Sequence, residues 1–347
     1  MSALPTPVRT PGDTRPATGV QHTLARCRAL VTPALRETVA GTHPWIGEMA
    51  AYSFGWCEVG GAPTGSAGGK GVRQALAVLG AEAAGAPGGA AVPGAVAVEL
   101  VHAFSLLHDD IMDGDEARRR RPTVWKAYGT GPAVLTGDAL FGLAVEALAD
   151  AGAPAVRPLA RALGDLVRGQ ADDLLFASRP WTGPDRVRPR EYRAMAEHKT
   201  GALLGCAAAL GAVLGGAPPA TVAALDRAGR HLGVAFQAVD DVLGIWGDPA
   251  VTGKPVHGDL RERKKTLPVL AALDSPAAGE LSALLESEAG PARIADLIDR
   301  AGGRTAALTE ARHQVTAARA ALESVPLAAG PAAELRSLLD FVVRREV

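Results

Sequence analysis

The chain has little of what several protein classes require. Aromatic residues make up 4% of its 347 residues, so the apolar 48% is mostly small side chains such as Ala, Leu and Val. Such residues favour closely packed helices. The formal net charge of −1 gives no overall field that would attract nucleic acid. Three scattered cysteines, Cys27, Cys57 and Cys206, form no disulfide framework and indicate a reducing compartment.

The sequence also shows no signal peptide and no convincing membrane span. Residues 1–20 contain four prolines and few large apolar residues, which predicts a disordered tail. The uncharged stretch Thr200–Ala220 is rich in Ala and Gly and ends in Pro218-Pro219. We interpret it as a buried core helix rather than a transmembrane segment. These features predict a cytoplasmic protein.

Apolar residues recur with helical spacing along the rest of the chain, and no segment shows sustained strand alternation. We therefore expect an all-α fold, with residues 21–347 in a single domain. The expected helices cover 22–38, 45–56, 73–85, 95–112, 135–149, 156–177, 191–214, 232–242, 266–273, 279–288, 292–301, 304–322 and 332–343.

A cluster of aspartates ends the apolar run Ala95–Met112. Asp109 and Asp113 are four residues apart, so both carboxylates project from one helix face. Two anions this close need a positive partner, and Mg²⁺ is usually held by one or two carboxylates together with substrate phosphates. Four arginines, 118–121, follow and could neutralise the same phosphates.

A second unit repeats this arrangement. Asp240 and Asp241 close the apolar run Leu232–Val242, and the basic run 261–265 follows. Two acidic units on separate helices, each followed by cations, predict a cavity that binds a diphosphate through metal ions.

Three weaker signals accompany these units. Gly68-Gly69-Lys70 precedes Arg73, but no Ser or Thr follows Lys70 as in a P-loop. His102 lies seven residues before Asp109 and shares its helix face. Lys199 precedes a long uncharged stretch, so we expect it to reach into a polar cavity.

Together, these motifs resemble the trans-isoprenyl diphosphate synthases, or polyprenyl synthetases, over about residues 68–268. The similarity rests on their order in the chain: Gly68-Gly69-Lys70, His102, Asp109–Asp113 with Arg118-Arg119, Gly169-Gln170, Lys199-Thr200, Phe236–Asp241 and Lys264–Pro268.

The resemblance implies a single bundle of long helices around a deep central cavity, usually dimeric, so we expect a homodimer. It implies that Asp109, Asp113 and Asp240 ligate three Mg²⁺ ions, with Mn²⁺ as an alternative, and that Asp110 and Asp241 orient ligands and waters. It also implies a reaction in which isopentenyl diphosphate extends an allylic diphosphate (dimethylallyl, geranyl or farnesyl). Arg118, Lys199, Thr200, Gln237 and Lys264 would bind the allylic diphosphate, and Lys70, Arg73, His102 and Arg119 the isopentenyl diphosphate.

Several positions depart from the family pattern. Gly71 stands where the family often has arginine, and Gln74 where it often has proline, so either could weaken isopentenyl diphosphate binding. Gly244 replaces the third aspartate of the second motif, although Asp248 lies one helical turn further on. Arg120 and Arg263 replace common glycines. None of these changes removes an implied metal ligand.

Other functions fit the sequence less well. A class I terpene cyclase usually carries an Asn/Ser/Glu metal triad, and this chain has no asparagine. An HD-type phosphohydrolase could use His108-Asp109 but needs further His and Asp ligands in order. A non-catalytic partner subunit of a two-chain prenyl synthase would be expected to lose aspartates from one motif.

The product length is predicted from the residues before the first motif. Phe104 is bulky, Ser105 is small, and the motif carries no insertion. This pattern resembles geranylgeranyl diphosphate synthases, which make a C20 product. A C15 farnesyl or a C10 geranyl product is the alternative, because Leu140 or Phe141 could close the cavity sooner.

Overall fold

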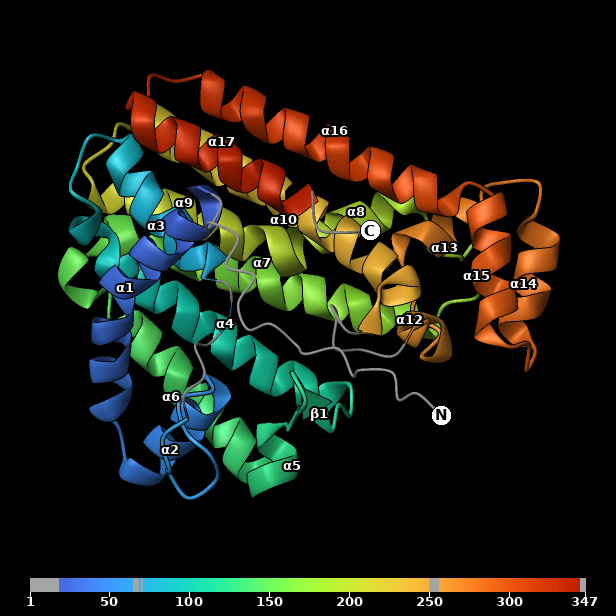
Figure 1. The fold of residues 1–347 in the computed structure, drawn as a ribbon, viewed down its shortest axis with the longest axis horizontal. Helices are drawn as coiled ribbons and strands as arrows, with labels where there is room; N and C mark the ends of the chain where they lie inside the picture. The colour runs from blue at the N-terminus through green and yellow to red at the C-terminus, as the bar shows by residue number, and fades with distance from the viewer. Residues whose placement is uncertain (1–18, 65–68, 70, 250–255, 344–347) are drawn as a thin grey trace, which may run out of the picture.

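Long α-helices form nearly the whole molecule (Figure 1). The computed structural model describes residues 19–64, 69, 71–249 and 256–343. Within these residues the only sheet is a two-stranded hairpin, so the all-α prediction is confirmed. The elements are α1 (Gly19–Ala40), α2 (Pro44–Ser53), α3 (Val72–Ala83), η1 (Gly88–Ala91), α4 (Val92–Met112), β1 (Ala117–Arg118), β2 (Arg121–Pro122), α5 (Val124–Tyr128), α6 (Thr130–Glu146), η2 (Ala149–Ala151), α7 (Ala153–Ser178), α8 (Pro189–Ala196), η3 (Glu197–Gly201), α9 (Ala202–Leu214), α10 (Pro219–Trp246), α12 (Gly258–Arg261), α13 (Leu267–Ala272), α14 (Ala278–Glu286), α15 (Pro291–Arg300), α16 (Gly303–Glu323) and α17 (Ala329–Val343).

Several helices begin earlier than their apolar pattern predicts. Proline lies in the first turn of α4, α7 and α10, where its missing N–H has no helical acceptor and its fixed φ suits a helix. The predicted tail, 1–20, is two residues too long, because α1 begins at Gly19 and Val20 packs against the core. The rest of that tail lies outside the described residues.

The central helices pack through small side chains, as the composition predicts. α10 packs against α9 and α16, α3 packs against α9, and α4 packs against α6. The main core consists mostly of Ala, Leu and Val. α12 to α15 contribute to a second, smaller cluster, on the right in Figure 1. All three cysteines are buried and free, so the absence of a disulfide framework is confirmed.

Two helices of the described chain are long and apolar enough to cross a membrane. They cover Gly88–Met112, with 61% of the apolar window buried, and Thr130–Ala151, with 33% buried. The core helix of a globular protein passes the same test, and the first of these ends in the aspartate cluster. The stretch suspected from the sequence forms α9 instead, whose residues 202–212 are buried as predicted.

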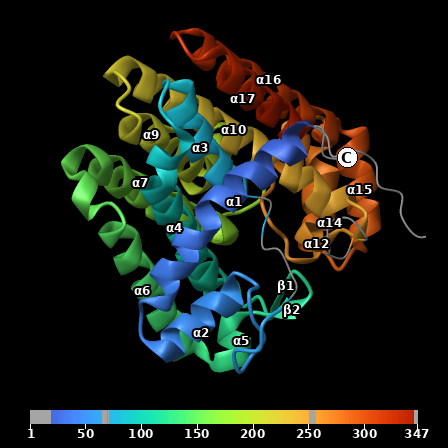
Figure 2. The ribbon, with the colours of Figure 1, turned by 60° about the vertical axis from the view of Figure 1, so that its left-hand side comes forward.

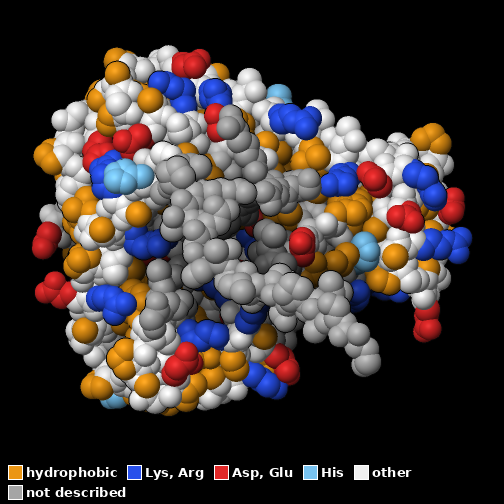
Figure 3. Space-filling view, viewed as in Figure 1, with side chains coloured by type: hydrophobic (Ala, Val, Ile, Leu, Met, Phe, Trp, Pro, Cys, Tyr) orange, Lys and Arg blue, Asp and Glu red, His pale blue; other side chains and the backbone are white. Residues whose placement is uncertain are grey.

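The face shown in Figure 3 carries Lys, Arg, Asp and Glu side chains scattered among one another. The charged groups that share a function must therefore be recognised by their positions on particular helices.

Candidate active site

The first aspartate unit ends α4. The backbone N–H of Asp113 donates to the carbonyl of Asp109 over 2.8 Å, which keeps the last turn helical. The pKa of Asp109 is raised to about 6, mainly by burial. The positive charge of Lys199 opposes this rise, and the negative charge of Asp113 contributes to it. Burial also raises the pKa of Asp113. The two carboxylates are therefore close together and only partly compensated by protein cations.

Asp110 has a different environment from the other two aspartates. It is buried, its Oδ1 accepts a hydrogen bond from Nε of Arg118 at 2.8 Å, and the Nη2 of the same arginine lies 2.6 Å from that oxygen in an ion pair. This paired contact fixes the guanidinium group beside the end of α4. Asp110 therefore orients Arg118 directly.

Arg118 lies on a hairpin that the sequence did not predict. Strands β1 and β2 pair Arg118 with Arg121, and Arg119 and Arg120 form the turn with φ values of 53° and 65°. A left-handed conformation costs a non-glycine residue of order 1 kcal/mol. The surrounding structure must therefore hold this turn in place.

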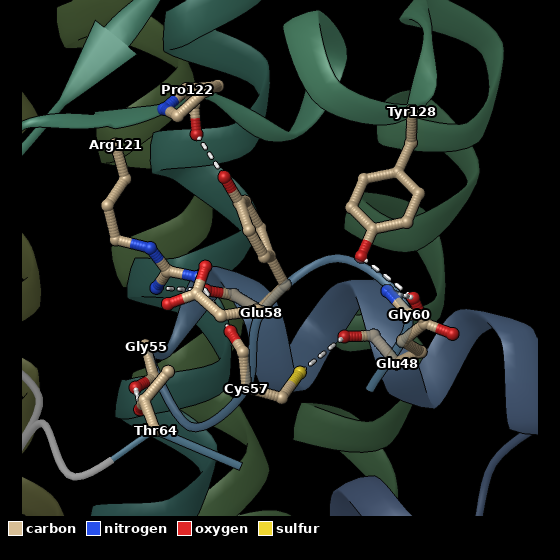
Figure 4. A network of polar contacts seen from close by, with 10 residues as sticks. Glu48, Gly55, Cys57, Glu58, Gly60, Thr64, Arg121, Pro122 and Tyr128 are labelled. Carbon is tan, nitrogen blue, oxygen red and sulfur yellow. Dashed lines mark hydrogen bonds and ion pairs between the residues drawn. The ribbon is translucent and has the colours of Figure 1, made fainter. Parts of the chain in front are cut away.

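A network of polar contacts anchors the hairpin to α2 and the loop that follows it (Figure 4). Arg121 donates through Nη2 to the carbonyl of Cys57 at 2.6 Å, and its guanidinium carbon lies 4.2 Å from the Tyr52 ring centroid. The Tyr52 hydroxyl donates to the carbonyl of Pro122 at 2.8 Å. Nearby, the Tyr128 hydroxyl donates to Glu48 at 2.9 Å. These contacts position the arginines on the turn.

The second aspartate unit lies on α10, and Asp241 connects three helices there. Its carboxylate accepts hydrogen bonds from the Tyr192 hydroxyl of α8, from the Leu267 N–H of α13 at 2.8 Å, and from the Gln237 amide at 3.0 Å. Burial raises the pKa of Asp241 to about 7, although the three donors oppose this shift. Asp241 therefore holds the neighbouring Asp240 in place on α10.

Gln237 and Thr200, both expected near the allylic diphosphate, contact each other. The Thr200 hydroxyl donates to Oε1 of Gln237 at 3.1 Å, and the Gln237 amide then donates to Asp241. The two side chains thus belong to the same polar chain as Asp241.

Thr200 and Lys199 lie on η3, a π-helical turn of residues Glu197–Gly201. A β-carbon on Gly169 of α7 would come within 2.7 Å of the Lys199 Cα, and one on Gly201 within 2.7 Å of the Arg230 carbonyl of α10. Only glycine allows these approaches. A π-turn is often found at functional sites, because it redirects side chains.

Lys199 is directed toward the aspartates. Its Nζ lies 2.6 Å from Oδ2 of Asp173 on α7, and its charge lowers the pKa of both Asp109 and Asp113. Lys264 also lowers the pKa of Asp113 and pairs with Glu262 at 2.7 Å. Cations from two separate elements therefore face the end of α4.

These carboxylates fit a divalent cation that is shared with a substrate. Within the described residues, no three His, Cys, Asp or Glu side chains are gathered tightly enough to hold a metal by themselves. Mg²⁺ needs only one or two carboxylates when phosphate oxygens complete its shell. The carboxylates of Asp109 and Asp113 offer hard oxygen atoms whose charge is only partly compensated, and that suits such an ion.

A second cationic cluster surrounds the first half of α4. Arg73, Arg119 and Arg118 each lower the pKa of His102, and burial lowers it most, so His102 is neutral near pH 7. Burial lowers the pKa of Arg73, and the nearby carboxylates of Glu99 and Asp240 oppose this shift. The structure thus brings Arg73, His102 and Arg119 together. Lys70, the fourth predicted member, lies outside the described residues.

The residues predicted to set product length lie one to two turns before Asp109. The Phe104 ring contacts the Phe141 ring of α6, with centroids 5.9 Å apart, and the His108 ring at 4.8 Å. The Ser105 hydroxyl donates to the carbonyl of His102 at 3.0 Å. Ser105 therefore contributes little bulk there, and the Phe104 ring lies beside the Phe141 ring.

Sequence reasoning missed three residues of the site. Asp173 follows the Gly169-Gln170 motif by three residues, and Tyr192 carries no local signal. Glu99 is the third and lies on α4. Arg73, Arg119 and Arg28 lower its pKa while burial raises it most. The alignment of Glu99 with His102 at i, i+3 was the only available signal.

Comparisons with known proteins agree with this geometry. A family model described as Polyprenyl synthetase matches residues 62–300. The chain is 44% identical over 347 residues to a (2E,6E)-farnesyl diphosphate synthase of Mycobacterium tuberculosis, with 96% of this chain and 94% of the relative covered. It is 43% identical over 335 residues to a geranylgeranyl diphosphate synthase of that species, with 93% of each covered.

The same similarity is found among solved structures. A polyprenyl synthetase from Streptomyces coelicolor A3(2) is 48% identical and superposes with a TM-score of 0.87, with 93% of this chain and 99% of that chain covered. A geranylgeranyl pyrophosphate synthetase from Pyrococcus horikoshii is 33% identical, with a TM-score of 0.83 and coverage of 94% and 99%. The chain belongs to the polyprenyl synthetase family and is a prenyltransferase.

Proposed function

We propose that the chain condenses isopentenyl diphosphate with dimethylallyl, geranyl or farnesyl diphosphate and makes geranylgeranyl diphosphate as its main product. The family acts on isoprenoid diphosphates and uses divalent metals. The observation that carries the proposal is the pair of aspartate units at the ends of α4 and α10, with Lys199 directed toward the first. Relatives named for C15 and for C20 products are almost equally similar, so the product length rests on Phe104 and Ser105.

Asp109, Asp113 and Asp240 would hold Mg²⁺, for which we propose three ions, with Mn²⁺ as an alternative. When bound, these ions withdraw electron density from the allylic diphosphate and favour its departure. Lys199 and Lys264 approach the same carboxylates and would neutralise the diphosphate beside them.

The other residues position and protect the reactants. Arg118 is held by Asp110, so it is oriented before substrate binds. Thr200 and Gln237 are held by the hydrogen-bonded chain that ends at Asp241. The apolar face of α4 would exclude water from the allylic cation. The double bond of isopentenyl diphosphate attacks that cation and a proton is lost. We assign no side chain as the general base.

We further propose a cytoplasmic homodimer. Two consecutive helices, α6 and α7, carry large apolar side chains that are exposed in the single chain: Val134, Leu135, Phe141, Val145, Val167, Leu174 and Leu175. Apolar side chains gathered on consecutive helices are typical of an interface, and a second copy of the chain would cover them. Light scattering coupled to gel filtration would test the homodimer, and Leu175→Glu should shift it toward the monomer.

The activity is tested with the purified chain, Mg²⁺, labelled isopentenyl diphosphate and each allylic primer in turn. We expect prenyl diphosphates as products, with C20 dominant after dephosphorylation and chromatography. A cyclic hydrocarbon would indicate a class I terpene cyclase instead. Turnover that appears only after a second protein is added would indicate a non-catalytic partner subunit.

A further inference from the structure

The loop before α3 lacks an arginine that the family often has. Gly71 precedes the first residue of α3 and has φ 73° and ψ 23°, a left-handed conformation. An L-residue there would be strained by of order 1 kcal/mol, so this loop conformation favours glycine. The chain must obtain the missing positive charge elsewhere or bind isopentenyl diphosphate with fewer cations.

Arg28 of α1 lies in the space beside Gly71. A β-carbon added to Gly71 would lie 3.4 Å from the Arg28 Nε and 3.5 Å from its Nη2. The same Nη2 donates to the carbonyl of Gly69 at 2.6 Å. The guanidinium group of Arg28 therefore lies against the loop, where a side chain at position 71 would begin.

Arg28 also differs from its neighbour on α1. Arg26 is bound in ion pairs with Glu82 at 2.6 Å and with Glu334 at 3.0 Å. Arg28 forms no ion pair within 4.0 Å among the residues for which the structure gives positions. Its charge is therefore available to a ligand.

Other cations converge on the same place. A β-carbon on Gly69 would lie 3.1 Å from Nη2 of Arg119. Burial raises the pKa of Glu99, and Arg28, Arg73 and Arg119 all lie close enough to lower it, while Asp240 is a second carboxylate near Arg73. Three positive charges therefore face two negative ones. The three arginines come from α1, α3 and the β1–β2 hairpin. Such an excess of charge suits a diphosphate.

An unsatisfied polar atom supports a missing ligand at this cluster. The Nε of Arg73 is buried and has no hydrogen-bond partner among the described residues, so this donor is free for an acceptor such as a phosphate oxygen. Buried polar groups normally have partners.

We propose that Arg28 binds the diphosphate of isopentenyl diphosphate and supplies the positive charge that glycine at position 71 cannot. This inference rests on the proposed function. It makes α1, which lies before the segment matched by the family model, part of the substrate site.

The test separates the charge of Arg28 from its hydrogen bond to Gly69. Arg28→Gln keeps a donor and removes the charge, whereas Arg28→Lys keeps the charge. We expect Arg28→Gln and Arg28→Ala to raise the KM for isopentenyl diphosphate about 10-fold, since one charge-assisted contact is lost. Arg28→Lys should change it by less, and kcat and the KM for the allylic substrate should change by less than about 2-fold.

Arg36→Ala is the matched control, because Arg36 is exposed on the same helix and stacks on Trp56 at 4.4 Å, away from this loop. It should behave like the unaltered chain. Titration calorimetry with isopentenyl diphosphate alone gives a second readout that needs no turnover. Weaker binding to Arg28→Gln, but not to Arg36→Ala, is expected.

Two results would overturn the proposal. If Arg28→Gln matches the unaltered chain while Arg28→Ala is impaired, Arg28 only fastens the loop at Gly69. If Arg28→Gln, Arg28→Ala and Arg28→Lys all match the unaltered chain, Arg28 has no part in binding. Failure of the unaltered chain to turn over any primer would instead refute the proposed function, and the calorimetric comparison would still decide the role of Arg28.

Discussion

The carboxylate of Asp259 occupies the space beside the Gly244 Cα. A β-carbon added to Gly244 would lie 2.5 Å from Cγ of Asp259 and 2.9 Å from its Oδ1, distances that real side chains do not show. Asp259 also raises the pKa of Asp241 and of Lys264, so it lies within the second aspartate unit. Position 244 therefore has no room for the third aspartate of the family pattern while Asp259 stays in place.

The first prediction follows from this overlap. Gly244→Asp, which restores the family residue, should lower the melting temperature and the turnover rate, because overpacking typically costs about 1–3 kcal/mol and two carboxylates would repel. Gly244→Ala should destabilise less. Gly164→Ala in α7 is the control, since a β-carbon there meets nothing within 4 Å. A Gly244→Asp variant with an unchanged melting temperature and a higher turnover rate would show that the Asp259 side chain moves aside at little cost.

The second prediction concerns the aspartates implied as metal ligands. Asp109→Ala and Asp240→Ala should each lower kcat roughly 10²-fold or more, because each removes a carboxylate expected to hold a metal ion. The rate is measured with saturating substrates over a range of Mg²⁺ concentrations. A near-normal rate for Asp109→Ala would contradict the assignment.

The third prediction uses the neutral state of His102. Burial and three neighbouring arginines hold its pKa well below 6.5, so it can contribute a hydrogen bond but no charge at neutral pH. His102→Gln should keep the KM for isopentenyl diphosphate within about 3-fold, whereas His102→Ala should raise it about 10-fold. The KM for the allylic substrate is the internal control. Equal losses in both variants would show that the imidazole ring itself is needed.

The aspartate units were predictable because their signal is local. Asp109 and Asp113 end an apolar helical run, and their four-residue spacing already places them on one face. Asp240 and Asp241 likewise form an acidic pair near the end of an apolar helical run, on α10. A helical period and a charge cluster are enough to find such a site.

The connections between elements were not predictable in this way. β1 and β2 contain two residues each, too few to show alternation, and two arginines in left-handed conformations contradict local preference. The pair of Lys199 and Asp173 joins residues 26 positions apart. The π-turn that aims Lys199 depends on the close approach of Gly201 to α10, which is a tertiary contact.

The fourth prediction concerns stability and pH. Arg179 lies 2.7 Å from Glu191 and lowers the pKa of that carboxyl, and the Arg188 N–H donates to it at 2.9 Å at the start of α8. Because the folded pKa lies below the ordinary value of 4.5, the ionised carboxylate stabilises the fold above that pH. The stabilisation is lost as the pH falls through the folded pKa.

Glu191→Gln should therefore lower the free energy of unfolding at pH 7 by about 0.5–1 kcal/mol, a modest value because both side chains are partly exposed. The difference between the two proteins should shrink as the pH falls below 4.5. Thermal melts of both proteins at pH 7 and below pH 4.5 check this. An equal difference at low pH would show that packing rather than charge is responsible.

The last prediction concerns product length. Phe104 lies five residues before Asp109, about 7–8 Å along the helix axis. Its ring contacts that of Phe141, so we expect the two aromatic side chains from α4 and α6 to form one barrier to the growing chain. Ser105 leaves its own position open, because its hydroxyl bonds to the backbone. A barrier at this depth agrees with a C20 product.

Removing either ring should open the barrier. Phe104→Ala should shift the main product from C20 to longer chains, and Phe141→Ala should shift it less because Phe104 remains. Val59→Ala, an exposed apolar residue in the loop after α2, is the control and should leave the product unchanged. Chromatography of dephosphorylated products measures each distribution. A C15 or C10 main product that does not change in Phe104→Ala would show that another residue stops elongation before the chain reaches these rings.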